Sequence, residues 1–206
     1  GIAAAMAYLH SNHIIHRDLK PSNILIDEYL CPKISDFGLS KIKHQNSESL
    51  TMQSTANVKG TPIYISPEIY QNVEYNNESD VYAFAFIMYE IITNEQPFAE
   101  CKSVEEIKTK VINGIRPQFP YPISDAYQDL IERCWNQDPS KRPTFDEIVD
   151  ELQNDPSYLT DEIEKDDFFQ YVDYIDEYKK TFDKTKKMIR LEDFIQNKTS
   201  SFKQVT

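Results

Sequence analysis

The sequence predicts an α+β fold in which helices predominate and a few short strands lie before residue 36. Two patterns lead to this fold class. Short apolar runs between polar residues (IIH, NILID and KIS) are typical of small strands. From residue 79 onward, apolar residues repeat at helical spacing instead. The chain has 206 residues, 40% of them hydrophobic, which is enough for one domain with a core and an appendage.

The first elements follow from local sequence. Residues 2–12 (IAAAMAYLHSN) are rich in Ala and carry apolar residues at helical spacing, so we expect a helix that ends at Asn12. The runs at 14–16, 23–27 and 33–35 are expected to be small strands that flank a loop. Residues 40–60 are polar and lack periodicity, which indicates a long loop. Long loops in compact domains are usually functional or disordered.

Helices are expected in the second half of the chain. The run VYAFAFIMYEII (81–92) is too short to cross a bilayer, and it predicts a buried core helix. Two Ser/Thr-x-x-Glu pairs fit the capping box at a helix start, namely Ser103 with Glu106 and Thr144 with Glu147. Further helices are predicted around 124–136 and 144–153. The loop before them is marked by three prolines: Pro117, Pro120 and Pro122.

The composition changes after about Asn154, where acidic and aromatic residues alternate. We therefore predict a main unit at 1–153 and an acidic, aromatic helical extension at 154–206. Apolar residues in the extension recur at helical spacing, which predicts an amphipathic helix: Phe168, Tyr171, Val172, Ile175 and Tyr178. Such a helix could dock on a partner or on another part of the chain. Packing on its own domain is the favoured interpretation.

Charge and cysteine usage bound the partners. The net charge of −12 argues against binding of nucleic acid or of an anionic membrane by bulk charge. The three cysteines are scattered without a CxxC pair, which suits a reducing compartment, and we expect a cytoplasmic protein with no membrane segment in this chain. The chain begins GIAAAMAYLH without Met or a signal peptide, so we expect that upstream sequence is missing.

The stretch HRDLKPSN (16–23) concentrates side chains that suit chemistry. Asp18 and Asn23 lie five residues apart in a loop, and Asp36 follows a short strand. Oxygen ligands of this kind suit Mg²⁺, which also bridges substrate phosphates. Lys20 is close enough to Asp18 for both to reach one reacting centre. A carboxylate that orients a hydroxyl, a lysine that offsets negative charge and metal ligands together describe phosphoryl transfer.

The order of the motifs then points to a family. IIHRDLKPSNILID, KISDFGLSK, GTPIYISPEIY, SDVYAFAFIMYEIITNEQPF and CWNQDPSKRPTFDEI follow one another. This series resembles eukaryotic protein kinases, whose HRDLxxxN, DFG and APE signatures it contains with SPE in place of APE. The resemblance covers residues 1 to about 152 and implies the C-terminal lobe only of a kinase-like α+β fold. That lobe is predominantly helical, with a small β-hairpin carrying the catalytic and DFG loops.

The resemblance implies roles for the motif residues. Asp18 is the expected catalytic base, and Lys20 is expected to contact the transferring phosphate. Asn23 and Asp36 are expected to hold Mg²⁺. Leu25 is expected beneath the adenine of ATP, with Ile87 and Ile91 of the core helix supporting it.

Further residues are given supporting roles by the same resemblance. His16 and Phe37, the latter next to Gly38 of DFG, are expected to stack in an internal column. Asp80 is expected to hold the backbone of the catalytic loop. The remaining expected contacts are a pair between Glu68 and Arg142 and the placement of Thr61 beside Asp18 and Lys20. His10, His13 and His16 are three apart, but nothing else completes a metal-ligand set.

The activation segment implied by the resemblance runs from Asp36 to Glu68. Arg17 could pair with a phosphate on it and so order the loop. The candidate phosphorylation sites are Ser47, Ser49, Thr51, Ser54 and Thr55. Either an upstream kinase or autophosphorylation would supply the phosphate. The alternative is that these residues are merely the polar residues of a loop.

The form DLKPSN resembles serine/threonine kinases, while SDVYAFAFIMYEI and CWNQDPSKRPTF resemble the tyrosine-kinase and tyrosine-kinase-like groups. Together they favour the tyrosine-kinase-like group, which is specific for Ser and Thr. The expected activity is ATP- and Mg²⁺-dependent phosphorylation of Ser or Thr in protein substrates, in signal transduction. The runner-up is a non-catalytic regulatory or protein-binding module, since the chain lacks the glycine-rich loop and the ATP-contacting lysine of the other lobe.

Overall fold

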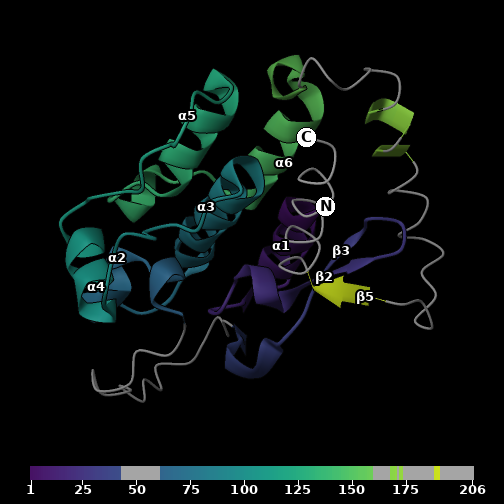
Figure 1. The fold of residues 1–206 in the computed structure, drawn as a ribbon. Helices are drawn as coiled ribbons and strands as arrows, with labels where there is room; N and C mark the ends of the chain where they lie inside the picture. Colours follow the sequence, from purple (N-terminus) through teal and green to yellow (C-terminus); the bar gives the residue numbers. More distant parts are fainter. Residues whose placement is uncertain (43–60, 160–167, 171, 174–187, 191–206) are drawn as a thin grey trace.

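The computed structural model describes residues 1–42, 61–159, 168–170, 172–173 and 188–190. Helices make up most of this structure (Figure 1), in agreement with the predicted predominance of helix. They are α1 (Ile2–Ser11), α2 (Pro67–Tyr70), α3 (Asn77–Thr93), α4 (Val104–Ile112), α5 (Asp125–Cys134) and α6 (Phe145–Asn154). Residues 168–170 and 172–173 are helical, and the rest of the predicted amphipathic helix lies outside the described residues.

The strands are short and form two small sheets. They are β1 (Ile14–Ile15), β2 (Ile24–Asp27), β3 (Pro32–Ile34), β4 (Lys41–Ile42) and β5 (Met188–Arg190). β1 pairs antiparallel with β4, and β2 pairs antiparallel with β3 as a hairpin. β5, on the opposite edge of β2, pairs Arg190 with Leu25 (Figure 1). The sequence predicted no strand after residue 154, because three residues carry too little pattern to indicate one.

The core is built around α3. All of its side chains from Ser79 to Tyr89 are buried, because α3 packs against α5 and lies among aromatic residues of the later helices. Phe86, for example, contacts Trp135 with ring centroids 5.5 Å apart. α1 packs against α6 and β3, which places the start of the chain beside the helix Phe145–Asn154. No helix in the described ranges is long and apolar enough to cross a lipid bilayer.

The helix starts agree with the capping signals, with one difference. In α6, the Thr144 hydroxyl accepts from the Glu147 backbone N–H and the Glu147 carboxylate accepts from the Thr144 N–H, so the predicted capping box is confirmed. In α4, Ser103 caps the Glu106 N–H at 3.2 Å. The Glu106 carboxylate, however, accepts from Lys102 N at 2.9 Å instead of from Ser103, so the reciprocal half of that predicted box is wrong.

Candidate functional site

A side chain at the start of α3 anchors the loop between β1 and β2. Asp80 lies in the first turn of α3, is buried, and accepts hydrogen bonds from the backbone N–H groups of His16 at 2.8 Å and Arg17 at 2.9 Å. Arg17 adopts a left-handed backbone conformation with φ +71°, which a non-glycine residue adopts only where its surroundings hold it. The carboxylate of Asp80 therefore fixes the path of the chain into residues 18–23.

Four polar side chains converge at the end of this loop. Lys20 Nζ lies 2.8 Å from Asp18 Oδ2 and donates to Thr61 Oγ1 at 3.2 Å. Asn23 Nδ2 donates to the backbone oxygen of Asp18 at 2.7 Å and to its Oδ2 at 3.1 Å. The Asp18 carboxylate is thus oriented by an ammonium and an amide, and all four groups share one small volume. A substrate hydroxyl placed here would meet a hydrogen-bond acceptor and a positive charge.

Asp36 is brought to the same region by the β2–β3 hairpin. Ser35 donates from its N–H and from its hydroxyl to the backbone oxygen of Asn23, at 2.8 and 2.9 Å. Asp36 follows directly, with a left-handed φ of +61°, and its Oδ1 accepts from Gly38 N at 3.2 Å. A Cβ at Gly38 would lie 3.1 Å from that Oδ1, so glycine here leaves the Asp36 carboxylate its room.

The oxygen atoms of Asn23 and Asp36 fit a hard cation. The Nδ2 group of Asn23 is used on Asp18, so its Oδ1 is the atom that can turn to a cation. Asp36 bonds Gly38 through Oδ1 and has a second carboxylate oxygen for the same purpose. Among the described residues there is no group of three or more His, Cys, Asp or Glu that could hold a metal ion. A cation here would therefore take its other ligands from water and substrate oxygens.

The predicted pair of rings is in contact. His16 is fully buried, and its ring meets that of Phe37 edge to face with centroids 5.4 Å apart. The His16 ring also has its Nε2 atom 3.0 Å from the backbone oxygen of Ser35. Phe37 remains 47% exposed, so one face of the ring pair is open.

The two α3 residues expected to support Leu25 differ in burial. Leu25 is half-buried in β2 and Ile87 is fully buried in α3. Ile91, in contrast, is 45% exposed. Ile91 follows Ile87 by one helical turn, so the two residues lie on the same face of α3. Helical spacing does not determine whether another element covers that face beside Ile91. Ile91 is therefore not part of the core.

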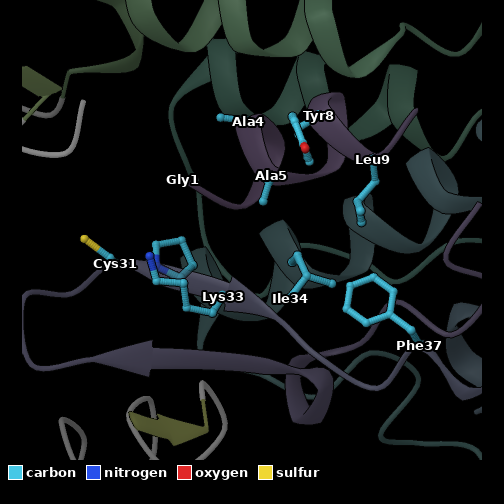
Figure 2. A pocket seen from close by; sticks show the side chains of 10 residues that line it. Gly1, Ala4, Ala5, Tyr8, Leu9, Cys31, Lys33, Ile34 and Phe37 are labelled. Atoms are coloured by element: carbon cyan, nitrogen blue, oxygen red, sulfur yellow. The ribbon is translucent and has the colours of Figure 1, made fainter. Parts of the chain in front are cut away.

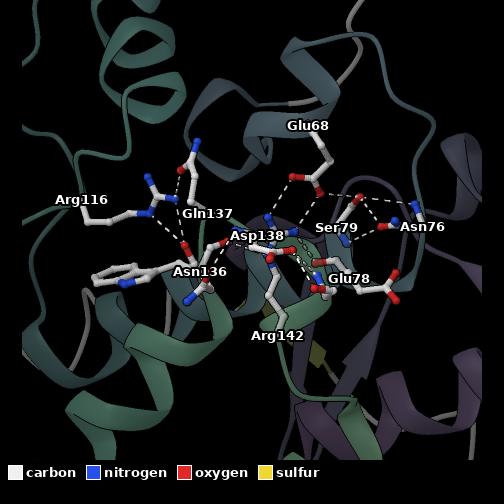
Figure 3. Close-up of polar contacts among 11 residues, drawn as sticks. Glu68, Asn76, Glu78, Ser79, Arg116, Asn136, Gln137, Asp138 and Arg142 are labelled. Atoms are coloured by element: carbon white, nitrogen blue, oxygen red, sulfur yellow. Dashed lines mark hydrogen bonds and ion pairs between the residues drawn. The ribbon is translucent and has the colours of Figure 1, made fainter.

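A buried ion pair ties the segment after Thr61 to the later helices (Figure 3). Arg142 donates through both terminal nitrogens to the two carboxylate oxygens of Glu68, each at 2.8 Å, and also to the backbone oxygen of Glu78 at 2.9 Å. Burial by itself would raise the pKa of Glu68, but the hydrogen bonds and charge of Arg142 outweigh it and lower that pKa. The carboxylate therefore stays ionised inside the protein.

Sequence reasoning missed a polar residue at the anchor. His10 of α1 lies with its Nε2 atom 2.9 Å from Asp80 Oδ2, and its ring meets Phe145 edge to face. The spacing of the three histidines raised only the question of a metal, and within the part of the chain that the structure describes none of the three belongs to a group that could hold a metal ion. No local signal could have paired residues 70 positions apart, since this contact depends on the packing of α1 near α3 and α6.

An apolar cavity of about 490 Å³ lies between α1 and β3 (Figure 2). Ala5, Leu9, Ile34 and Phe37 contribute to its lining. Asp18, Lys20 and Asn23 do not line it, so this cavity is separate from the polar cluster. The candidate phosphorylation sites Ser47, Ser49, Thr51, Ser54 and Thr55 lie outside the described residues.

Comparison with known proteins gives consistent matches over the same region. Residues 1–152 match the family model described as protein tyrosine and serine/threonine kinase. The chain is 40% identical to the dual specificity protein kinase shkC of Dictyostelium discoideum over 155 residues, which cover 74% of this chain and 30% of that protein. It is 35% identical to the serine/threonine-protein kinase STY17 of Arabidopsis thaliana over 151 residues, which cover 73% and 25%. The chain thus spans less than a third of either relative.

Proposed function

Because this chain belongs to the protein tyrosine and serine/threonine kinase family, we propose that it is the C-terminal lobe of a kinase that transfers phosphate from ATP to Ser or Thr of protein substrates. The observation that carries the proposal is the cluster of Asp18, Lys20, Asn23 and Thr61 on a loop held by a buried carboxylate. The residues DLKPSN and the name of the relative STY17 support Ser and Thr as acceptors.

In this proposal each residue of the cluster has a distinct task. The Asp18 carboxylate accepts a hydrogen bond from the substrate hydroxyl and orients it for in-line attack on the phosphorus. Lys20, which bonds both Asp18 and Thr61, offsets the charge that develops on the phosphoryl oxygens. Asn23 keeps Asp18 in place through one hydrogen bond to its backbone oxygen and one to its Oδ2. The chain thus contributes positioning and charge.

Cofactor binding follows from the same arrangement. Asn23 Oδ1 and the Asp36 carboxylate would hold Mg²⁺, which supplies neutralisation of phosphate charge when bound. Leu25 on the β2–β3 hairpin would lie under the adenine of ATP. The His16–Phe37 ring pair would keep the loop that carries Asp36 in register with the catalytic loop.

We further propose how the chain is divided into units, where the protein acts and how it is regulated. Residues 1–153 would form the kinase unit, with the β2–β3 hairpin carrying both catalytic loops, and residues 154–206 would be an extension. The protein would act in the cytoplasm on protein partners. A phosphate on one of the residues 47–55, added by an upstream kinase or by autophosphorylation, would pair with Arg17 and raise activity.

The test compares the full-length gene product that contains this chain with its Asp18→Asn variant. Transfer of labelled phosphate from ATP to Ser- and Thr-containing peptides is measured. We expect the variant to lose at least about a hundredfold in kcat, because the acceptor hydroxyl loses its base. Asp146→Asn, at an exposed residue of α6, serves as the matched control and should leave kcat unchanged.

Two outcomes would contradict the proposal. Equal activity of Asp18→Asn and wild type would remove Asp18 from the mechanism, and a wild type that transfers phosphate only to Tyr would overturn the acceptor class. The 206-residue chain alone is assayed in parallel for MgATP binding. We expect none at millimolar ATP, and saturable binding would show that this lobe holds nucleotide by itself.

A further inference from the structure

Glu74 and Tyr75, which precede α3, each contact a positively charged side chain at the paired strands β1 and β4. The guanidinium carbon of Arg17 lies 4.9 Å from the centroid of the Tyr75 ring. Lys41 Nζ lies 3.8 Å from Glu74 Oε1. Arg17 follows β1 and Lys41 begins β4, where it pairs with Ile15. The segment of Glu74 and Tyr75 therefore contacts one cation that follows β1 and one cation that lies in β4.

Arg17 is held at its backbone, while the Nε donor of its side chain lacks a partner within the described structure. Its backbone is fixed by the bond to Asp80 and by its left-handed conformation. Its Nε atom is buried and has no hydrogen-bond partner within the described structure. The guanidinium carbon of Arg17 lies over the Tyr75 ring, and an aromatic ring attracts a cation through its face. Tyr75 therefore contacts Arg17 while the Nε donor is left without a hydrogen-bond partner.

The state of Tyr75 suits this contact. Burial raises the pKa of Tyr75 to about 12, although the nearby charge of Arg17 opposes the rise. The phenol is therefore neutral at physiological pH, and the attraction is between a cation and a neutral aromatic ring. The Glu74–Lys41 contact is solvent-exposed on both sides and contributes little by comparison.

We propose that Tyr75 is a positioning residue whose ring holds the Arg17 guanidinium so that its in-plane N–H groups are presented to a phosphate group. This inference rests on the proposed function, in which Arg17 pairs with a phosphorylated side chain. It adds a second residue to that recognition, one that touches Arg17 and not the phosphate. Planar guanidinium donors match phosphate oxygens well, and an orphaned buried Nε donor is satisfied by such a ligand.

The expected effect follows from preorganisation. A long Arg side chain loses rotamer freedom when it binds a ligand, and prior stacking removes much of that cost from the binding step. Without the ring, phosphate affinity at Arg17 is expected to fall roughly tenfold. With phenylalanine in place of Tyr75 the ring remains, so the affinity should stay within about twofold of wild type.

The experiment uses the 206-residue chain, with inorganic phosphate as the probe. The Nε–H signal of Arg17 is followed by NMR in wild type and in the variants Tyr75→Phe and Tyr75→Ala, and Arg17→Gln identifies the signal by its loss. We expect Tyr75→Ala to broaden or average the free signal and weaken phosphate binding roughly tenfold, and Tyr75→Phe to restore both. Glu74→Gln is the neighbouring control and should change the affinity by less than about threefold.

The outcomes distinguish a specific effect on the position of the Arg17 side chain from a general loss of stability of the protein. Circular dichroism melts of the variants show whether Tyr75→Ala is still folded, and Tyr75→Leu, which fills the space without a ring, replaces it if it is not. Wild-type affinity in both ring-less variants would overturn the proposal. So would a Tyr75→Phe variant that behaves like Tyr75→Ala, since the hydroxyl would then be responsible. Phosphate binding is read without ATP, so absence of kinase activity leaves this test intact.

Discussion

At the scale of single residues, Tyr82 shows how packing can outweigh a lost hydrogen bond. Tyr82 is completely buried in α3, and the guanidinium carbons of Arg142 and Arg116 lie 5.0 and 5.2 Å from its ring centroid. Burial raises the pKa of its hydroxyl well above the ordinary value, with the two cations opposing the rise. That hydroxyl has no hydrogen-bond partner in the described structure. The aromatic ring of Tyr82, and not its hydroxyl, makes the contacts at this position.

The substitution Tyr82→Phe is therefore expected to stabilise the protein. Removing a buried, unsatisfied hydroxyl while keeping the ring should raise the free energy of unfolding by about 1 kcal/mol. Tyr127→Phe is the matched control. The Tyr127 hydroxyl donates to the backbone oxygen of Tyr158 at 2.9 Å, so its loss should lower the free energy by about 1 kcal/mol. Urea unfolding of both variants measures the difference, and equal losses would contradict the assignment.

At the scale of elements, the start of α6 is set by side chains that lie three residues apart. Thr144 and Glu147 satisfy each other's backbone N–H groups at the first turn. The bond to the backbone N–H of Thr144, together with the Thr144 hydroxyl, lowers the pKa of Glu147. α6 packs directly on α1, the helix that precedes the loop carrying Asp18. A change at this cap should therefore alter the stability of the whole described helical unit.

We expect Thr144→Ala to lower the free energy of unfolding by about 1 kcal/mol, because the backbone N–H of Glu147 at the helix start loses the hydroxyl that accepts its hydrogen bond. Thr144→Ser keeps a hydroxyl and should recover most of the loss. Thr109→Ala in α4 provides the contrast: it makes the same change within a helix, where alanine is favoured, and should be neutral or slightly stabilising. Thermal melts decide between them. A neutral Thr144→Ala variant would show that the cap is not used in solution.

At the scale of the whole molecule, Glu68 and Arg142 join parts of the chain that are 74 residues apart. Ser79 of α3 donates to Glu68 Oε1 at 3.2 Å, and Arg142 also donates to the backbone oxygen of Asn136 at 2.9 Å (Figure 3). The pair therefore connects α2, the start of α3 and the loop before α6. Both side chains are buried, so removing one partner leaves the other uncompensated.

This pair predicts a pH dependence of stability. The pKa of Glu68 is lower in the folded protein than its ordinary value of 4.5. The folded state thus binds fewer protons, and the stability that the pair adds is complete above that value and is lost as pH falls through the folded pKa. The free energy of unfolding, measured from pH 7 to pH 3, should therefore decline more steeply in wild type than in Glu68→Gln.

At pH 7 the variant Glu68→Gln should be less stable by about 3 kcal/mol, because Arg142 keeps its buried charge without a counter-ion. Glu95→Gln at an exposed position is the control and should follow the wild-type curve. A Glu68→Gln curve parallel to wild type across the acid range would mean that another carboxylate controls the decline. Glu151, whose pKa Arg133 lowers, would be the next to test.

Local signals carried most of the prediction of the fold. The helix ending at Asn12, the short strands near the start and the long apolar helix could be predicted, because each depends on spacing and propensity within about a dozen residues. The strand Met188–Arg190 could not be predicted, because it exists through its pairing with β2 more than 160 residues earlier. The reciprocal cap of Glu106 failed for a different, local reason, because the backbone N–H of Lys102 donates to the Glu106 carboxylate in place of that of Ser103.

For the candidate site, the sequence motifs predicted which residues belong to it, and the tertiary structure determined which side chains those residues contact. Asp18, Lys20, Asn23 and Asp36 stand within 19 positions of one another, so the sequence alone could gather them. His10, Tyr75 and Tyr82 belong to no such cluster. Each gains its importance from a partner that only folding brings near, respectively Asp80, Arg17 and the two arginines around Tyr82.

The sequence by itself determined the family and the residues of the proposed chemistry, since phosphoryl transfer needs particular side chains at short, fixed spacings along two loops. Only the tertiary structure decided which side chains are buried and what each one touches. Ile91 is exposed although its spacing suggested the core, and Arg17 rests on a tyrosine 58 positions further along the chain. The reason is physical: burial and long-range contacts depend on how helices and strands pack, and that packing has no period in the sequence.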